Sequence, residues 1–417
     1  MPQDSVLRPI LWNISFDGIL DVVEDDNNDG ESHIICYADD TLIVVTGRNL
    51  LRTRIRACVM ANMVVNKIAR LGLSVATEKT EAMLFYGKRT DDLPNYIAIN
   101  DINVNLMSNI KYLGIFIDAK WSFNDHFIYI KEKAGRVIRA LNRVMPNLRG
   151  PDERRCRLFA NVILSVILYG APVWRDEVVS NRLQKVMGSF ERSVAQRVIS
   201  AYRTVSSIAA LLLARMPPLK ILAPMRKMVY DQLKRHREEE GVITRGTRNE
   251  IKETEIRRMC ELWRGHLERP NIPGEYTKMA VVPRLETWMM RNHGSMSFHL
   301  TQLMTGHGSF VKFLCRIGKK GDPSCDFCGE DVDNALHVLR ECPVWDPQRI
   351  ELKRKLGLTR DFTLGDIIDA IISSGEHWRT FSAFAQEAMR EKEEEERRGK
   401  RARTYPFFSS GDDGSSG

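Results

Sequence analysis

The sequence predicts an α+β protein in which a mixed N-terminal region precedes a long helical region and a small cysteine- and histidine-rich module. Three observations lead to this prediction. The first 120 residues combine apolar, β-branched runs with segments of helical periodicity. From Phe123 onward the apolar residues recur at helical spacing. Four potential metal ligands lie within the short stretch 325–342.

The N-terminal region contains both kinds of periodicity, separated by turn-rich stretches. The run Ile34 to Val45, IICYADDTLIVV, indicates a buried strand that carries Asp39 and Asp40. The other expected elements are a helix over 10–23, an acidic surface connection over 24–31, a helix over 50–71, a turn with an extended segment over 72–88, and a second buried strand over 110–118.

The C-terminal two thirds is predicted to be mainly helical. The first helix of this region places Arg136, Arg139 and Arg143 on one face, and its other face is apolar, with Phe127, Ile130, Ala134, Val137, Ile138, Leu141 and Val144. Further helices are expected over 158–168, 181–200 and 221–240. The polar stretch 241–256 predicts a flexible connection, 387–403 a solvated helix end, and 409–417 disorder.

Composition narrows the class of protein. The 417-residue chain has 43% hydrophobic residues and a net charge of +8, so a folded protein with a polyanionic partner is expected, nucleic acid before an anionic membrane. The longest apolar run, 162–173, is shorter than the ~20 residues that a membrane-spanning helix needs. The scattered cysteines indicate a reducing, intracellular compartment.

The paired carboxylates of Asp39 and Asp40 need an explanation, because burying two adjacent charges costs several kcal/mol. A bound divalent cation removes this cost, and hard oxygen ligands suit magnesium, which serves nucleotidyl transfer. The alternative is that Ala38-Asp39-Asp40-Thr41 is a turn between two strands. A four-residue pattern alone does not distinguish the two.

The second candidate site is the pattern Cys325-x2-Cys328-x8-His337-x4-Cys342, whose spacing suits one tetrahedral zinc ion. Gly329 fits the tight turn after the second cysteine. Lys319, Lys320 and Arg340 would be available to phosphates if the module binds single-stranded nucleic acid. A purely structural zinc clip is the alternative. The other cysteines, Cys36, Cys58, Cys156, Cys260 and Cys315, are expected in the core.

Several segments resemble the reverse transcriptases of LINE-like, non-LTR retrotransposons. Tyr37-Ala38-Asp39-Asp40 resembles their signature, and Met1 to Asn13 resembles the segment that precedes it. The palm segment that follows is similar to 72–81, and Lys111-Tyr112-Leu113-Gly114 resembles the primer-grip hairpin. Toward the C-terminus, LYGAPVW (168–174), SAYRTVS (200–206), MPPL (216–219), TGHGSF (305–310) and the CCHC pattern resemble type-I, ribosomal-DNA-inserting elements of arthropods. Leu168, Tyr169 and Trp174 are expected to be buried.

The resemblance implies an RNA-directed DNA polymerase whose partners are an RNA template, a DNA primer or target and deoxynucleoside triphosphates, with no membrane. Asp39 and Asp40 would hold magnesium, Gln3 and Tyr37 would lie near the nucleotide and template, and Lys79 would assist the leaving pyrophosphate. The implied domains are a partial palm over 1–120, a helical thumb over 121–215 whose Arg136, Arg139 and Arg143 grip nucleic acid, a helical connection over 216–310, a zinc knuckle over 311–347, and a helical and disordered tail over 348–417. Localisation would be nuclear at the site of integration, after a cytoplasmic ribonucleoprotein stage.

The sequence departs from the family pattern in two respects. No fingers region and no strand with a third aspartate precede Pro2, so we expect a fragment of a longer polyprotein without polymerase activity of its own, and we expect the target-cutting endonuclease to lie outside the chain. Asp4 and Arg8 occupy positions where the family has small residues. The alternatives are a non-catalytic nucleic-acid-binding zinc protein derived from a reverse transcriptase and an unrelated zinc-dependent interaction module.

Overall fold

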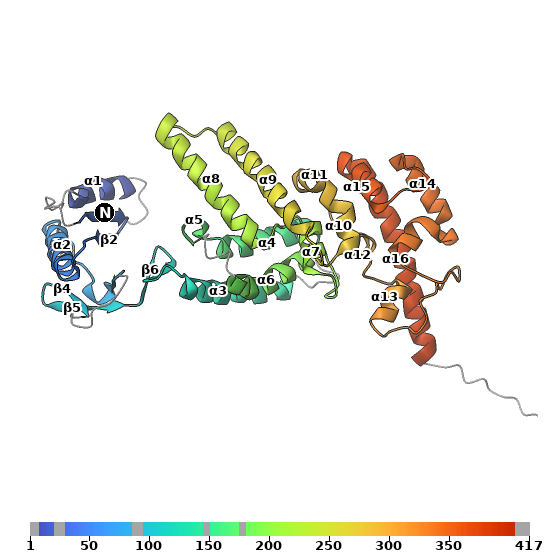
Figure 1. Cartoon of the computed structure of the whole chain (residues 1–417), viewed down its shortest axis with the longest axis horizontal. Helices are drawn as coiled ribbons and strands as arrows, with labels where there is room; N and C mark the ends of the chain where they lie inside the picture. The colour runs from blue at the N-terminus through green and yellow to red at the C-terminus, as the bar shows by residue number, and fades with distance from the viewer. Residues whose placement is uncertain (1–7, 21–29, 86–94, 145–150, 175–180, 405–417) are drawn as a thin grey trace, which may run out of the picture. The chain divides into compact units, whose positions relative to one another are not determined.

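The computed structural model describes residues 8–20, 30–85, 95–144, 151–174 and 181–404, and the chain divides into two compact units, 1–126 and 127–417 (Figure 1). The first unit mixes helices and strands, and the second is helical, so the predicted α+β class is confirmed.

The first unit contains two long helices, a short 3-10 turn and seven strands within its described residues. These elements are α1 (Arg8–Leu20), β1 (Ser32–Tyr37), β2 (Asp40–Val45), α2 (Leu50–Arg70), η1 (Thr77–Lys79), β3 (Ala82–Met83), β4 (Tyr96–Ile99), β5 (Ile102–Met107), β6 (Asn109–Tyr112) and β7 (Ile115–Asp118). The strands form three small sheets, β1-β2, β3-β5-β4 and β6-β7, in which only β3 and β5 pair in parallel.

The core of this unit is built on α2. The Asn49 side chain accepts a hydrogen bond from the Arg52 amide and caps the helix, which is the usual role of asparagine at this position. One face then buries Met60, Val64 and Ile68 at helical spacing, and these side chains pack with Phe16 and Ile19 of α1. The apolar side of the β1-β2 pair covers the same cluster.

Two segments whose apolar pattern predicted single strands fold as hairpins, in agreement with the alternative of a turn at 38–41 and with the resemblance of 111–114 to a hairpin. The register pairs Tyr37 with Asp40 and Tyr112 with Ile115, so each hairpin turns through two residues. Leu113 and Gly114 both have positive φ, as a type I′ turn requires. The prediction failed because the apolar residues run through both turns and hide the chain reversal.

The second unit is helical throughout its described residues. Its elements are α3 (Asn124–Val144), whose first turn belongs to the first unit, α4 (Glu153–Ile167), α5 (Ala171–Trp174), α6 (Asn181–Val198), α7 (Ser207–Leu213), α8 (Leu219–Glu240), α9 (Arg245–Leu267), α10 (Glu275–Val281), η3 (Val282–Arg284), α11 (Leu285–Met290), α12 (Phe298–Thr305), α13 (Val311–Arg316), η4 (His337–Glu341), η5 (Pro343–Trp345), α14 (Asp346–Leu356), α15 (Leu364–Ser373) and α16 (Gly375–Thr404).

The predicted flexible connection over 241–256 is wrong, because most of it belongs to α9. Gly241, at φ 79°, ends α8, and the Thr244 side chain accepts a hydrogen bond from the Thr247 amide at the start of α9. The two helices lie side by side (Figure 1). The first turns of α9 are polar on every side. Buried residues recur at helical spacing only from Glu255 onward, with Met259, Cys260, Trp263 and Leu267.

Leu168 and Trp174 are buried as expected, but the expectation for Tyr169 is wrong. The chain reverses direction after α4, where Gly170 has φ 67°, and the Tyr169 side chain is 54% exposed. Its carbonyl accepts a hydrogen bond from Trp174 Nε1 at 2.8 Å. The backbone of Tyr169 therefore holds the turn while its ring faces solvent.

The long helix α16 organises the C-terminal part of the second unit. It packs against α12, α14 and α15. The expected helix over 387–403 is confirmed, but its solvated character is only partly so, since Ala388, Met389 and Lys392 are buried. The stretch 409–417, predicted to be disordered, lies outside the described residues.

Asp118 at the end of β7 should stabilise the first unit. Its carboxylate accepts hydrogen bonds from the amides of Lys120, Ser122 and Phe123 and from the Ser122 hydroxyl. Burial alone would raise the pKa of this carboxyl, but the hydrogen bonds outweigh it and hold the pKa below 3.8. The stabilisation is therefore complete above that value and is lost as the pH falls through the folded-state pKa. We expect Asp118→Asn to lower the free energy of unfolding by about 1–2 kcal/mol at neutral pH.

The measurement is urea unfolding of the full chain, with hydrogen exchange of the Ser122 and Phe123 amides reporting on this loop. The difference between wild type and variant should shrink at acid pH. Asp101→Asn, at the exposed turn between β4 and β5, is the matched control and should have little effect. Equal effects of the two substitutions would contradict this role of Asp118.

Candidate catalytic hairpin and metal centre

Asp39 and Asp40 lie at the tip of the β1-β2 hairpin. The pairing of Tyr37 with Asp40 leaves Ala38 and Asp39 as the two turn residues, and Ala38 has φ 53°. Trp12 Nε1 of α1 donates a hydrogen bond to the Ala38 carbonyl at 2.9 Å. The helix that follows the Pro-Gln segment thus fixes the turn that carries the aspartates.

Both aspartates are exposed, which corrects the expectation of a buried strand bearing charge. The chain reverses at Ala38 and Asp39, so the carboxylates project at the end of the hairpin and not between its faces. Neither carboxylate accepts a hydrogen bond or forms an ion pair in the part of the chain that the structure describes. Turn and metal site, which we treated as alternatives, are compatible, because a hairpin tip can offer adjacent carboxylates to an ion that keeps several waters.

The β6-β7 hairpin lies near the same tip. Burial raises the pKa of the Tyr112 phenol, and the negative charges of Asp40 and Cys36 raise it further. The Tyr112 hydroxyl is buried and has no hydrogen-bond partner among the described residues. Tyr112 belongs to the Lys-Tyr-Leu-Gly segment, so the structure brings this segment close to the aspartates.

Among the described residues, the structure shows no hydrogen bond or ion pair that joins the other predicted site residues, Tyr37 and Lys79, to the two carboxylates at the hairpin tip. Tyr37 precedes the turn and is 65% exposed. Lys79 is the last residue of η1 and is also exposed, and no hydrogen bond or ion pair within the described ranges joins it to the aspartates. Gln3 lies outside the described residues, as do Asp4 and the side chain of Arg8.

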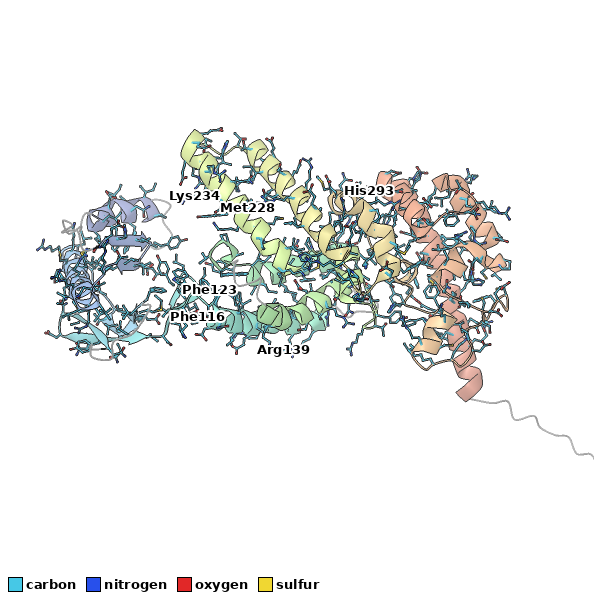
Figure 2. All side chains as sticks on the ribbon, viewed as in Figure 1. Phe116, Phe123, Arg139, Met228, Lys234 and His293 are labelled. Atoms are coloured by element: carbon cyan, nitrogen blue, oxygen red, sulfur yellow. The ribbon has the colours of Figure 1, made fainter. Side chains whose placement is uncertain are left out.

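The three predicted arginines of α3 lie on its exposed side. Arg136, Arg139 and Arg143 are all exposed, whereas Phe127 and Ile130 on the opposite side are buried. Figure 2 labels Arg139 on this helix. The predicted division into a basic and an apolar face is therefore correct for the side chains that the structure describes.

The four predicted soft ligands form one cluster. The sulfur atoms of Cys325, Cys328 and Cys342 and a ring nitrogen of His337 all lie within 4.8 Å of one another. All but Cys328 are buried, and all three cysteines are free thiols. Zinc bond lengths of about 2.3 Å to sulfur and 2.0 Å to nitrogen would place such atoms about 3.4–3.8 Å apart. A small inward shift of these side chains would therefore enclose a zinc ion.

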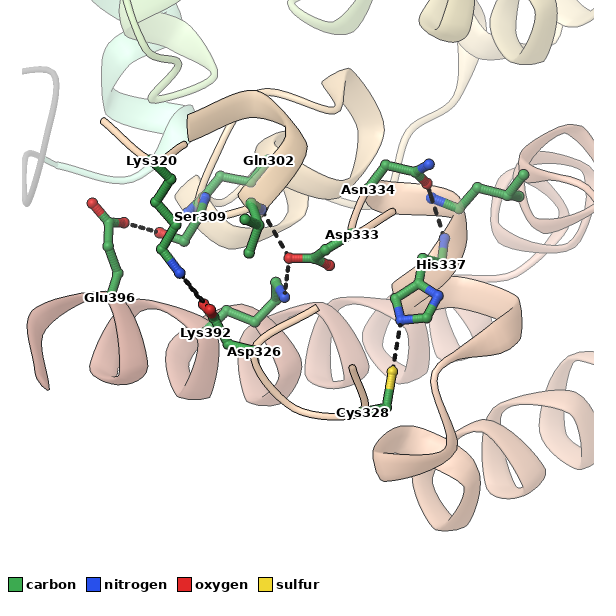
Figure 3. Close-up of polar contacts among 12 residues, drawn as sticks. Gln302, Ser309, Lys320, Asp326, Cys328, Asp333, Asn334, His337, Lys392 and Glu396 are labelled. Atoms are coloured by element: carbon green, nitrogen blue, oxygen red, sulfur yellow. Dashed lines mark hydrogen bonds and ion pairs between the residues drawn. The ribbon is translucent and has the colours of Figure 1, made fainter. Parts of the chain in front are cut away.

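Local backbone geometry creates the cluster, and Figure 3 shows two of its ligands, Cys328 and His337, together with Asn334. Gly329, at φ 79°, allows the chain to turn after the two cysteines, as predicted, and the Cys325 amide bonds to the Glu330 carbonyl. The Asn334 side chain accepts the His337 amide at 3.0 Å, and the single π-helical turn η4 ends where the Cys342 amide bonds to the His337 carbonyl.

The electrostatics of the cluster suit a cation. Burial raises the pKa of the Cys342 thiol to about 12 and also raises that of Cys325, so the thiolates that zinc requires need a nearby positive charge. His337 Nε2 faces the Cys328 sulfur at 3.3 Å, while Nδ1 lies 3.4 Å from a Glu341 carboxylate oxygen. A carboxylate behind the imidazole is the usual arrangement at zinc-bound histidines.

Sequence reasoning missed three residues that hold this cluster in place. Lys392 of α16 donates to Asp333 Oδ2 at 2.7 Å, and Arg349 of α14 donates to the Cys342 carbonyl at 2.6 Å. The signal for Lys392 was present, because it continues the buried positions Ala385, Ala388 and Met389 at helical spacing. No comparable signal marks Asp333 or Arg349.

The basic residues that we assigned to phosphate binding near the cluster are partly engaged elsewhere. Lys320 pairs with Asp326 inside the module, and Arg340 lies 3.3 Å from an Asp361 carboxylate oxygen. Lys319 also takes part in an interaction. Of the five isolated cysteines, Cys156 and Cys260 are buried, and Cys36, Cys58 and Cys315 are partly buried.

Residues 1–117 match the model of the reverse transcriptase (RNA-dependent DNA polymerase) family. The chain is 26% identical over 399 residues to a 115 kDa protein in the type-1 retrotransposable element R1DM of Drosophila melanogaster, covering 93% of this chain and 38% of that protein. It is 26% identical over 362 residues to a retrovirus-related Pol polyprotein from a type-1 retrotransposable element R1 of Bradysia coprophila, covering 84% of this chain and 35% of that protein. A retrovirus-related Pol polyprotein from the type-1 retrotransposable element "R1 2" of Nasonia vitripennis is also 26% identical, over 368 residues. This match includes 84% of this chain and 86% of that protein.

The chain thus spans little more than a third of the length of the first two relatives. No solved structure matches it. Among the described helices, none combines the length and the apolar composition that crossing a membrane would require. Residues 1–117 are thus similar to the reverse transcriptase family, and the chain as a whole is similar to proteins of type-1 retrotransposable elements R1 from three insects.

Proposed function

We propose that this chain forms part of an RNA-directed DNA polymerase that copies the RNA of a non-LTR retrotransposon into DNA at a nicked chromosomal target. The observation that carries the proposal is the exposed Asp39-Asp40 pair on a hairpin tip that Trp12 fixes and Tyr112 approaches. The reaction would be attack of a primer 3′-hydroxyl on the α-phosphate of a deoxynucleoside triphosphate, with release of pyrophosphate.

The residues of the hairpin suit magnesium. Two adjacent, solvent-exposed carboxylates are hard oxygen ligands, and they leave coordination positions for water and phosphate oxygens. Bound magnesium would supply charge neutralisation at the attacking and leaving oxygens. Asp39 and Asp40 would hold the magnesium. The hydrogen bond from Trp12 to the Ala38 carbonyl would keep the turn that carries both carboxylates in one conformation.

Nucleic acid would be held by residues outside the hairpin. The exposed face of α3 with Arg136, Arg139 and Arg143 offers three cations to the phosphates of a template-primer duplex. Tyr37 and Gln3 would lie toward the nucleotide and template, and Lys79 would act on the leaving pyrophosphate. We place this chemistry in the nucleus at the integration site.

For the cysteine cluster, we propose one structural zinc ion held by Cys325, Cys328, His337 and Cys342. A structural role is supported by the burial of the ligands and by the ion pairs that occupy Lys320 and Arg340. Both features suit a clip that fastens its segment to α14 and α16 better than an open nucleic-acid-binding knuckle.

The polymerase proposal predicts a loss of RNA-templated primer extension in the Asp39→Ala variant. The assay would use an element protein in which this sequence is part of a complete reverse transcriptase domain, with magnesium as the only divalent cation. Removing one of the metal-holding carboxylates should lower the rate by at least about 1,000-fold, equivalent to about 4 kcal/mol of transition-state stabilisation.

Asp101→Ala is the matched control, since it removes an aspartate from the exposed β4-β5 turn of the same unit, and it should leave the rate within about twofold. Undiminished extension by Asp39→Ala would refute the assigned role. Template binding without any extension by the wild-type protein would support the alternative, a non-catalytic nucleic-acid-binding protein.

The zinc proposal predicts one zinc ion per chain and metal-dependent stability of the second unit. At free zinc about 1,000-fold above the dissociation constant, a chelator should lower the free energy of unfolding by about 4 kcal/mol. Cys328→Ser should weaken zinc binding by at least about 100-fold. Cys315→Ser, a partly buried cysteine outside the cluster, should not. A full complement of zinc in Cys328→Ser would argue against this ligand set.

A further inference from the structure

Two buried cations flank the cysteine cluster. The Lys392 side chain is 2% exposed and the Arg349 side chain 4%. They come from different helices, α16 and α14. Taking a lone cation out of water costs several kcal/mol, so each must be compensated by negative charge nearby.

Lys392 reaches the first pair of cysteines. Its ammonium donates to Asp333 Oδ2 at 2.7 Å (Figure 3) and lies 5.2 Å from the ring centroid of Phe327, between Cys325 and Cys328. The Asp333 carboxylate is fully buried and also accepts the Val311 amide at 2.8 Å. The ammonium of Lys392 and the carboxylate of Asp333 therefore both lie beside the segment that carries Cys325 and Cys328.

Arg349 reaches the second pair of ligands. Its guanidinium donates to the carbonyls of Val338, Leu339 and Cys342 and pairs with Asp346, whose side chain is 57% exposed. The carbonyls carry only partial charge, and solvent weakens the contribution of Asp346.

The buried charges therefore do not balance without a metal. Lys392 and Arg349 contribute two positive charges and Asp333 one negative charge, while neutral thiols contribute none. A Zn²⁺ ion with three thiolates and one neutral imidazole carries one net negative charge. The other acids near the cluster, Glu341 and Asp326, are exposed, and Asp326 is paired with Lys320.

We infer that Lys392 and Arg349 are charge-compensating positioning residues of the zinc centre, so that the buried region is electrically neutral only when a divalent cation is bound by all three thiolates. This inference rests on the proposed zinc site and deepens it. The pair Lys392-Asp333 then acts as more than a structural ion pair, because its positive member stabilises the loaded cluster and its negative member opposes it.

The two members of the pair should thus shift zinc affinity in opposite directions. The experiment is competition for zinc between the full chain and a chromogenic chelator at fixed pH. Lys392→Met should weaken zinc binding by about 10- to 100-fold, the usual range for groups that support metal ligands. Asp333→Asn, which keeps an acceptor for the Val311 amide, should leave zinc binding as tight as in wild type or tighter. The double variant should return close to wild type.

Two further comparisons control for side effects. Lys320→Met also removes a lysine that pairs within the module, but one with greater side-chain exposure, 19%, so it should change the affinity by no more than about twofold. Arg349→Lys, which keeps the charge, should bind zinc more tightly than Arg349→Met. Should Lys392→Met not fold, Asp333→Asn and the double variant still decide the question.

A purely structural ion pair predicts that Lys392→Met and Asp333→Asn weaken binding alike, and this result would overturn the inference while leaving the zinc site intact. Equal zinc affinities of Arg349→Lys and Arg349→Met would show that Arg349 does not compensate charge at the zinc centre. Absence of zinc binding by the wild-type chain would instead refute the proposed zinc site itself.

Discussion

The buried ion pair between Lys392 and Asp333 joins the cysteine and histidine module to α16, the helix against which α12, α14 and α15 pack. Asp333 also anchors its own segment through main-chain bonds to Pro323 and Lys312. A charge pair with so little access to water is stable only when its surroundings complete the electrostatic balance. The four proposed zinc ligands are part of these surroundings, so zinc bound there as proposed would couple packing, charge and metal binding in this region.

The β1-β2 hairpin places its acidic side chains in the opposite environment. The chain reverses at Ala38 and leaves the carboxylates of Asp39 and Asp40 exposed to water. Because water screens the two carboxylates, the electrostatic free energy of placing them side by side is small. The chain thus combines an open site of hard oxygen ligands with a closed site of soft ligands, which are the arrangements expected of magnesium in catalysis and of structural zinc.

Strong local periodicity made part of the fold predictable. The helix over 50–71 and the basic and apolar faces of α3 follow from residue spacing alone, and the CCHC pattern identified the cluster of ligands. The apolar pattern alone did not reveal the hairpin turns, because apolar residues continue through them; the turn alternative at 38–41 and the resemblance of 111–114 to a hairpin did. The helix α9 was missed because its first turns are polar on every side.

The supporting residues of the metal centre were the least predictable. Asp333 and Arg349 gain their roles from contacts with segments distant in sequence, which no local pattern reveals. Lys392 lies in a run of alternating charges that resembles a solvated helix, and only its register with Ala388 and Ala385 distinguishes it from its neighbours.

Binding of a divalent cation at the hairpin tip is the central requirement of the proposed function, and it can be tested without catalysis. Paramagnetic Mn²⁺ can replace magnesium, and the isoleucine methyl signals of the full chain report where it binds. We predict that Mn²⁺ broadens the signals of the β1-β2 hairpin, from Ile34, Ile35 and Ile43. The broadening should disappear when Asp39 and Asp40 are both replaced by alanine. Hairpin signals that Mn²⁺ leaves sharp, or that it broadens equally in the double variant, would contradict the account.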